Sequence, residues 1–266
     1  MIQVAFPSYH LGTPLEGITP TQWISFDRVL IVKDVLTGGG RIAKTPNDAE
    51  AFRINAFKLH NIENQINASH TGTQARLRPP KTITLLRKSR DRRILNEDEV
   101  IELLSRYGPV QTVEFTAETP VEKQLAIMQS TGILVSTHTS ALANSVFLPP
   151  GAAVIEIIHR NWLWQGLDLS FKVHSAAAGD RHHWAWRATT PDQVFYINPR
   201  DKVRFGGDDW AGEKCDTDEC VEAHTNVDVI VNLDEFGQLL EDVVPKVWGG
   251  VSVTDAERPW PGHSTP

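Results

Sequence analysis

Short apolar runs separated by polar stretches dominate the chain from Lys81 onward. The runs are continuous rather than alternating, as expected for parallel strands that helices cover on both faces. They occupy residues 83–86, 110–115, 132–137 and 153–158. The stretches between them carry helix start and stop signals, at 96–106, 119–130 and 140–147. This order predicts an α/β fold with a Rossmann-like, doubly wound parallel sheet.

The helix signals are local. Asn96 is a favourable N-cap, Glu99 stands at the capping-box position, and Gly108 is placed to end that helix. Thr119 and Pro120 predict a second helix start. Pro149-Pro150 stops the third helix.

The pattern is weaker outside this block. A strand is expected at 26–32, a helix at 47–66, a late strand at 227–231 and a final helix that Asn232 caps and that runs to about Trp248. We therefore divide the chain into 1–80 as a remnant N-terminal or linker region, 81–250 as the Rossmann-like domain, and 251–266 as a disordered tail.

Composition narrows the function. The 266 residues carry a formal charge of −7, with a pI near 5.8, which argues against nucleic acid as a partner. No apolar run is long enough to predict a membrane span, and no signal peptide is seen, so the chain as it stands is expected in the cytoplasm. Cys215 and Cys220 fit either a local disulfide or two free thiols, and Asn67-Ala68-Ser69 is a sequon usable only in a secretory compartment.

Two loops follow predicted strands, and ligands bind at the carboxyl ends of such strands. The first, Arg87 to Asn96, holds five basic residues in seven positions and leads into a helix start, which suits a diphosphate. A solvated basic loop is the alternative. The second contains His138, Thr139, Ser140 and Asn144. His138 is a candidate base, and the hydroxyl residues are candidate phosphate ligands; a capping cluster with a structural histidine is the alternative.

Other candidates are weaker. Glu156 is an acid within an apolar strand, placed either to accept bonds from a sugar hydroxyl or to pair with an arginine. His174, His182 and His183 match no metal-ligand spacing but leave a metal-dependent hydrolase as an alternative. Asp216-Thr217-Asp218 is read as solvated surface. The tryptophans around Trp162 suit either sugar stacking or core packing.

Taken together, these segments resemble glycosyltransferase family 61. The resemblance is carried by an ordered set of motifs: Ile83–Glu97 with Arg92-Arg93 and Ile94-Leu95-Asn96, the helix with Gln124, the His138–Asn144 block, the Phe147-Leu148-Pro149-Pro150 turn and the Val154-Ile155-Glu156 strand. It covers about residues 81–158, and residues 23–80 more loosely.

The resemblance implies one lobe of a GT-B-type, inverting transferase that uses a UDP-sugar, such as UDP-GlcNAc or a UDP-pentose, with a glycan or glycoprotein acceptor. No cofactor is required on this view, although Mn²⁺ is possible. Family members are mostly lumenal, so the Golgi or ER is the alternative location. By matching, His138 is the catalytic candidate. The implied substrate-binding residues are Arg87, Arg92, Arg93, Asn96, Thr139, Ser140, Asn144 and Glu156, and no metal ligands are predicted.

Three departures qualify this expectation. The family's His-Gly-Ala-Gly is His138-Thr139-Ser140-Ala141 here, which places side chains where backbone approaches phosphate. The N-terminal lobe is expected to be incomplete, and no membrane anchor is seen in the sequence. A catalytically inactive or truncated nucleotide-sugar binder is therefore the first alternative, and it predicts UDP binding without turnover.

Overall fold

A computed structural model describes residues 46–62, 78–162, 170–207 and 217–253 of the chain. The strand expected at 26–32, the sequon at Asn67 and most of the expected tail lie outside these residues.

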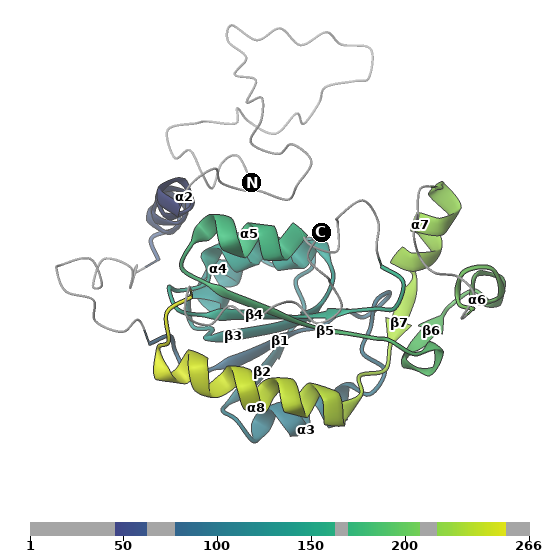
Figure 1. The fold of residues 1–266 in the computed structure, drawn as a ribbon. Coiled ribbons are helices and arrows are strands. Elements are labelled where there is room, and N and C mark those ends of the chain that lie inside the picture. Colours follow the sequence, from purple (N-terminus) through teal and green to yellow (C-terminus); the bar gives the residue numbers. More distant parts are fainter. Residues whose placement is uncertain (1–45, 63–77, 163–169, 208–216, 254–266) are drawn as a thin grey trace, which may run out of the picture.

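A five-stranded, all-parallel sheet forms the centre of the molecule (Figure 1). Its strands lie in the order β2-β1-β3-β4-β5. Their bounds are β1 (Ile83–Leu86), β2 (Val110–Val113), β3 (Ile133–Thr137), β4 (Ala153–Ile158) and β5 (His182–Arg187). The chain steps from β1 outward to β2 and then back across β1 to β3. The gap between β1 and β3 is therefore the topological switch point, where ligands of such sheets bind.

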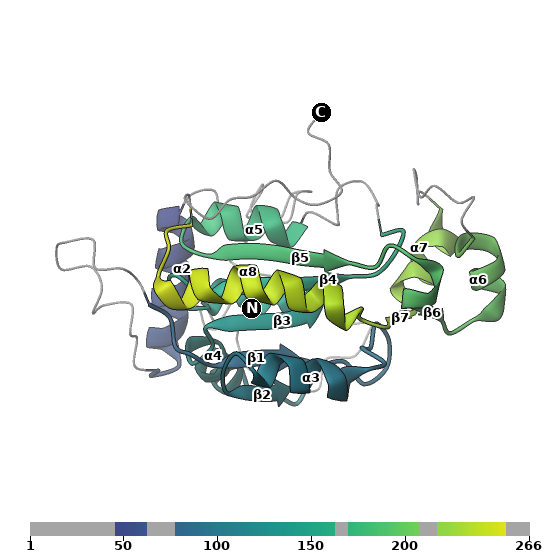
Figure 2. The same ribbon diagram turned by 60° about the horizontal axis from the view of Figure 1, so that its bottom comes forward.

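Helices cover both faces of this sheet (Figures 1 and 2). One face carries α3 (Glu97–Ser105) and α8 (Leu233–Gly249) over a core that includes Ile83, Val135 and Ile155. The other face carries α2 (Pro46–Leu59), α4 (Val121–Gln129), the 3₁₀ helix η2 (Ser140–Phe147) and α5 (Ser170–Ala178), over a core that includes Leu86, Leu134 and Val154. The predicted Rossmann-like α/β architecture is confirmed.

Beyond β5 the chain builds a small second layer at the carboxyl edge of the sheet. It contains η4 (Pro191–Gln193), β6 (Val194–Tyr196), α6 (Pro199–Phe205), α7 (Asp218–Thr225) and β7 (Val227–Val229). β6 and β7 pair antiparallel, and β7 also bridges to Ile94 in the loop after β1. We call residues 189–231 the small subdomain, of which residues 208–216 lie outside the described ranges.

Several local predictions need correction. Asn96 is not a side-chain cap for α3, because its amide bonds Val231 instead. The helix expected at 47–66 ends at Leu59, and the helix at 140–147 is 3₁₀. By contrast, Asn232 caps α8 as predicted, because its side-chain oxygen accepts hydrogen bonds from the backbone N–H groups of Asp234 and Glu235.

Helix α2 packs on the α/β sheet although it belongs to the region predicted as a linker. Arg53 is 2% exposed and forms a two-bond ion pair with Asp180, in the turn between α5 and β5. It also donates a longer bond to the carbonyl of Leu148. A buried guanidinium with these partners fixes α2 against α5 and η2. The division at residue 80 stays a prediction.

Within the described residues, no helix has the length and apolar character needed to cross a bilayer.

Candidate functional site at the switch point

The loop after β1 reaches across the switch point to the end of β3. Arg92 adopts a left-handed backbone conformation, with φ of 55°, which is strained for a residue with a side chain. Thr137 Oγ1 donates to the Arg92 carbonyl at 2.8 Å, and Arg92 Nη1 donates to the His138 carbonyl at 3.0 Å. Burial lowers the pKa of Arg92, and the charge of Asp91 partly offsets this. The two predicted loops therefore meet, through Arg92.

Two buried hydrogen-bonding atoms at this junction have no partner. Arg92 Nε is buried without an acceptor, and Thr139 Oγ1 is buried without a donor or acceptor. Thr139 is 1% exposed and stands at the N-cap of η2, where its side chain makes no capping bond. Ser140, the first residue of η2, is exposed. Unpaired buried polar groups are costly, and helix N-termini favour anions. The arrangement suits an anionic ligand.

His138 belongs to a buried three-residue hydrogen-bonded chain on adjacent strands. Its Nδ1 bonds Glu156 Oε1, and His183 Nε2 bonds Glu156 Oε2 at 2.8 Å. Glu156 is fully buried, whereas the side chains of His138 and His183 are 7% and 3% exposed. Burial alone raises the pKa of Glu156, but the hydrogen bonds from both histidines outweigh it and leave that pKa below its usual value.

This chain of bonds follows from strand register. Glu156 pairs with Ser136 on β3, and Val154, two residues earlier, pairs with His183 on β5. Residues two apart along a strand face the same side, so all these side chains lie on the sheet face that α5 covers. Both oxygens of Glu156 are occupied by histidines, so the arginine partner considered from sequence is replaced by two imidazoles.

Aromatic rings surround His138. The rings of Trp162 and Phe171 lie 5.3 and 5.2 Å from its own, centroid to centroid. His159, at the end of β4, lies 5.0 Å from Trp162, and His159 Nε2 and Trp162 Nε1 are buried without hydrogen-bond partners. The pKa of His159 is well below its usual value, mainly because the ring is buried and also because positive charges lie nearby. His159 is therefore neutral near pH 7.

Arg93 and Asn96 turn away from this junction toward the small subdomain. The backbone N–H, Nε and Nη2 of Arg93 donate to Asp228 at 2.8, 3.0 and 2.6 Å, and Asp228 is fully buried. The hydrogen bond and charge of Asp228 raise the pKa of Arg93. The amide of Asn96 both donates to and accepts from the backbone of Val231. These two residues join β7 to the loop after β1.

The remaining predicted residues lie at the periphery. Arg87 is exposed and pairs with Glu97 at 3.0 Å. Asn144, on η2, donates to Gln124 on α4 at 3.2 Å. Sequence reasoning missed the roles of His183 and Asp228, because the partners that define them are 27 and 135 residues away.

The proposed metal-binding histidines do not converge. His182 and His183 are consecutive residues of β5 and therefore face opposite sides of the sheet. In the described part of the chain, no group of three His, Cys, Asp or Glu side chains is arranged to hold a metal ion. Cys220 is disulfide-bonded; the other cysteine of the sequence, Cys215, lies outside the described residues.

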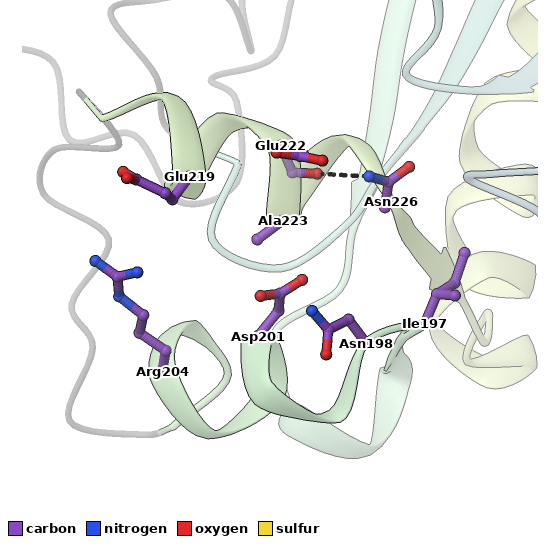
Figure 3. Close-up of a pocket in the computed structure, with 8 residues that line it drawn as sticks. All are labelled: Ile197, Asn198, Asp201, Arg204, Glu219, Glu222, Ala223 and Asn226. Atoms are coloured by element: carbon purple, nitrogen blue, oxygen red, sulfur yellow. Dashed lines mark hydrogen bonds between the residues drawn. The ribbon is translucent and has the colours of Figure 1, made fainter.

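A surface pocket lies between α6 and α7 and contains none of the predicted site residues (Figure 3). Asp201, Glu219 and Glu222 line it together with Arg204. Three of the four charged residues in its lining are acidic, which is a poor match for a phosphate-bearing ligand. The switch point, rather than this pocket, is the candidate site.

The parallel sheet order and the helices on both of its faces define a Rossmann-like α/β domain. The family model for glycosyltransferase 61 matches residues 7–155, more than half of the chain. The chain belongs to glycosyltransferase family 61. The match includes β1, β3 and the loop residues Arg92, His138 and Thr139, and it ends one residue before Glu156.

Several glycosyltransferases are similar to shorter stretches of the chain. A xylan glycosyltransferase of Arabidopsis thaliana is 24% identical over 115 residues, which are 43% of this chain and 23% of the relative. The EGF domain-specific O-linked N-acetylglucosamine transferase of Drosophila melanogaster is 37% identical over 76 residues, 27% of this chain and 14% of the relative. Human protein O-linked-mannose β-1,4-N-acetylglucosaminyltransferase 2 is 30% identical over 94 residues, which are 35% of this chain and 16% of the relative. The chain thus matches less than a quarter of the length of each relative.

Proposed function

We propose that the chain binds the nucleotide-sugar donor of an inverting glycosyltransferase, with the diphosphate of a UDP-sugar at the switch point. The observation that carries this proposal is the pair of buried, unpartnered atoms, Arg92 Nε and Thr139 Oγ1, beside His138. Both can donate to a phosphate oxygen. The N-terminus of η2 adds a favourable dipole for an anion.

The chemistry is a displacement at the anomeric carbon. The acceptor hydroxyl forms the new C–O bond, its proton passes to a base, and the bond to UDP breaks with UDP leaving as the anion. Arg92 and the first turn of η2 would stabilise the negative charge that develops on the leaving diphosphate. His138 is the proposed base. Glu156 is an ionised carboxylate and accepts only, so the Nδ1 of His138 carries the proton and Nε2 is the free acceptor.

The family and the relatives support glycosyl transfer, and they leave the sugar, the acceptor and the stereochemical course as parts of this proposal. The relatives are named for xylan, arabinosyl and N-acetylglucosamine transfer. UDP-pentoses and UDP-GlcNAc are therefore the first donors to screen, with glycan and protein hydroxyls as acceptors. Arg87, Arg93, Asn96 and Asn144 would then shape the loops around the donor.

Calorimetric titration with UDP, with and without Mn²⁺, tests the donor site. Saturable binding is expected. Thr139→Val replaces the hydroxyl with a methyl group and should weaken UDP binding about 10-fold, the effect of losing one hydrogen bond to a charged group. Thr112→Val, an exposed position on β2, is the matched control and should leave the affinity unchanged. No saturable binding by the folded chain at millimolar UDP would overturn the proposal for this chain.

Turnover separates the enzyme from an inactive relative. An active transferase should release UDP from a donor in the presence of acceptor, and His138→Ala should abolish this while retaining UDP binding. UDP binding without turnover for any donor would instead favour the nucleotide-sugar-binding relative that has lost activity. The family's two glycines are replaced here by Thr139 and Ala141, and this loss gives the inactive relative a specific basis as the second candidate.

A further inference from the structure

His183 lies on β5, the one strand of the five-stranded parallel sheet that the sequence pattern did not predict. β5 has the sequence His-His-Trp-Ala-Trp-Arg and lies at the edge of the sheet beside β4. The His183 side chain is 3% exposed and bonds Glu156 Oε2. Nothing in the resemblance to the family includes this residue.

Glu156 needs this second partner if it is to stay charged. A fully buried carboxylate is stable as an anion only when donors occupy its oxygens. His138 occupies one oxygen and His183 the other. Without His183, one oxygen would lack a donor, and the protonated acid would be favoured.

The protonation of Glu156 decides which nitrogen of His138 is free. Facing an ionised carboxylate, Nδ1 of His138 must carry the proton, and Nε2 is then a proton acceptor. Facing a carboxylic acid that donates, Nδ1 becomes the acceptor and Nε2 keeps the proton. In that tautomer His138 cannot take a proton from an acceptor hydroxyl.

We propose that His183 is a positioning residue, which holds Glu156 as an anion aimed at His138 and so keeps Nε2 of His138 available as the base. This inference rests on the proposed role of His138. The neighbouring His182 offers an internal control, because it is equally buried but faces the opposite side of β5 and stacks on Trp184.

The ¹⁵N chemical shifts of the imidazoles test this directly, since they report the tautomer without requiring turnover. The His138 signals are assigned by their loss in His138→Gln. The wild-type chain should show His138 with its proton on Nδ1. His183→Ala should shift it toward the other tautomer, and His183→Gln, whose amide can still donate to Glu156, should restore it. His182→Gln should leave it unchanged.

Kinetics supply the second readout. His183→Ala should lower the turnover rate by about 10- to 100-fold, the effect of losing a hydrogen bond to a charged group, with UDP affinity retained and partial rescue in His183→Gln. A His183→Ala chain that keeps the wild-type tautomer and turnover would overturn the inference. If UDP fails to bind even the wild-type chain while the tautomer shift occurs, the donor-site proposal fails and the positioning role of His183 stands.

Discussion

Buried neutral histidines should make the stability of this chain depend steeply on pH. His174 lies on α5, is 3% exposed, and has no hydrogen-bond partner at Nε2. Burial, together with the charge of His183, lowers the pKa of His174 from its usual value of 6.5 to about 4. In the unfolded chain the imidazole has its ordinary pKa of about 6.5.

Acid should destabilise the folded chain, because the unfolded chain binds more protons. As the pH falls below about 6.5, the unfolded chain takes up a proton at His174 and the folded chain does not, so acid favours unfolding. The stability is fully present above that pH and is lost as the pH falls toward 4. Each pKa unit is worth about 1.4 kcal/mol, so the loss from His174 is about 2 kcal/mol at pH 5 and about 3 kcal/mol when the pH is well below 4.

Urea unfolding at pH 8 and pH 5 measures this contribution. His174→Phe keeps a ring beside Phe171 and removes the titrating group, so the wild-type chain should lose about 2 kcal/mol more than the variant between these two pH values. Lys172→Gln, on the exposed side of α5, should keep the wild-type dependence. Equal pH dependence in the wild-type chain and His174→Phe would refute the reasoning. The lowered pKa values of His159, His182 and His224 act in the same direction and remain in both proteins.

Three further predictions concern the loop after β1, helix α8 and the residue before β3. Asn96→Ala removes both bonds to Val231 and should lower the free energy of unfolding by about 2 kcal/mol in urea titration; an unchanged midpoint would contradict the joining role of Asn96. Gly237→Ala should raise the free energy of unfolding by about 1 kcal/mol. Gly237 lies within α8, and only the Leu103 side chain is near the added carbon. Gly132→Ala should severely destabilise the fold, because the added carbon would lie 1.8 Å from the Pro80 carbonyl oxygen; similar behaviour of the two glycine variants would contradict this packing argument.

The sequence predicts those elements whose signal lies within a single segment, such as a continuous apolar run. β1, β3 and β4 are fully buried apolar runs, and each was predicted to within a residue. β5 was missed because its histidines and tryptophans show no apolar run, and because the residue that makes His183 acceptable in the interior, Glu156, lies on another strand. No periodicity within β5 contains that information.

The basic loop shows why charge counts alone do not define a ligand site. Five cationic residues before α3 predicted a phosphate pocket, yet the fold supplies carboxylates to several of them: Glu97 to Arg87, Asp91 to Lys88, and Asp228 to Arg93. Those carboxylates neutralise charge that would otherwise attract a phosphate.

Arg92 also pairs with Asp91, at 3.7 Å, but its guanidinium donates to the His138 carbonyl at the end of β3 and keeps a buried Nε without an acceptor. Its backbone is left-handed, and the Thr137 hydroxyl donates to its carbonyl. A strained backbone persists where surrounding contacts determine it, and such strain clusters at functional sites. The geometry of the loop, more than its net charge, therefore supports Arg92 as the arginine of the proposed diphosphate site at the switch point.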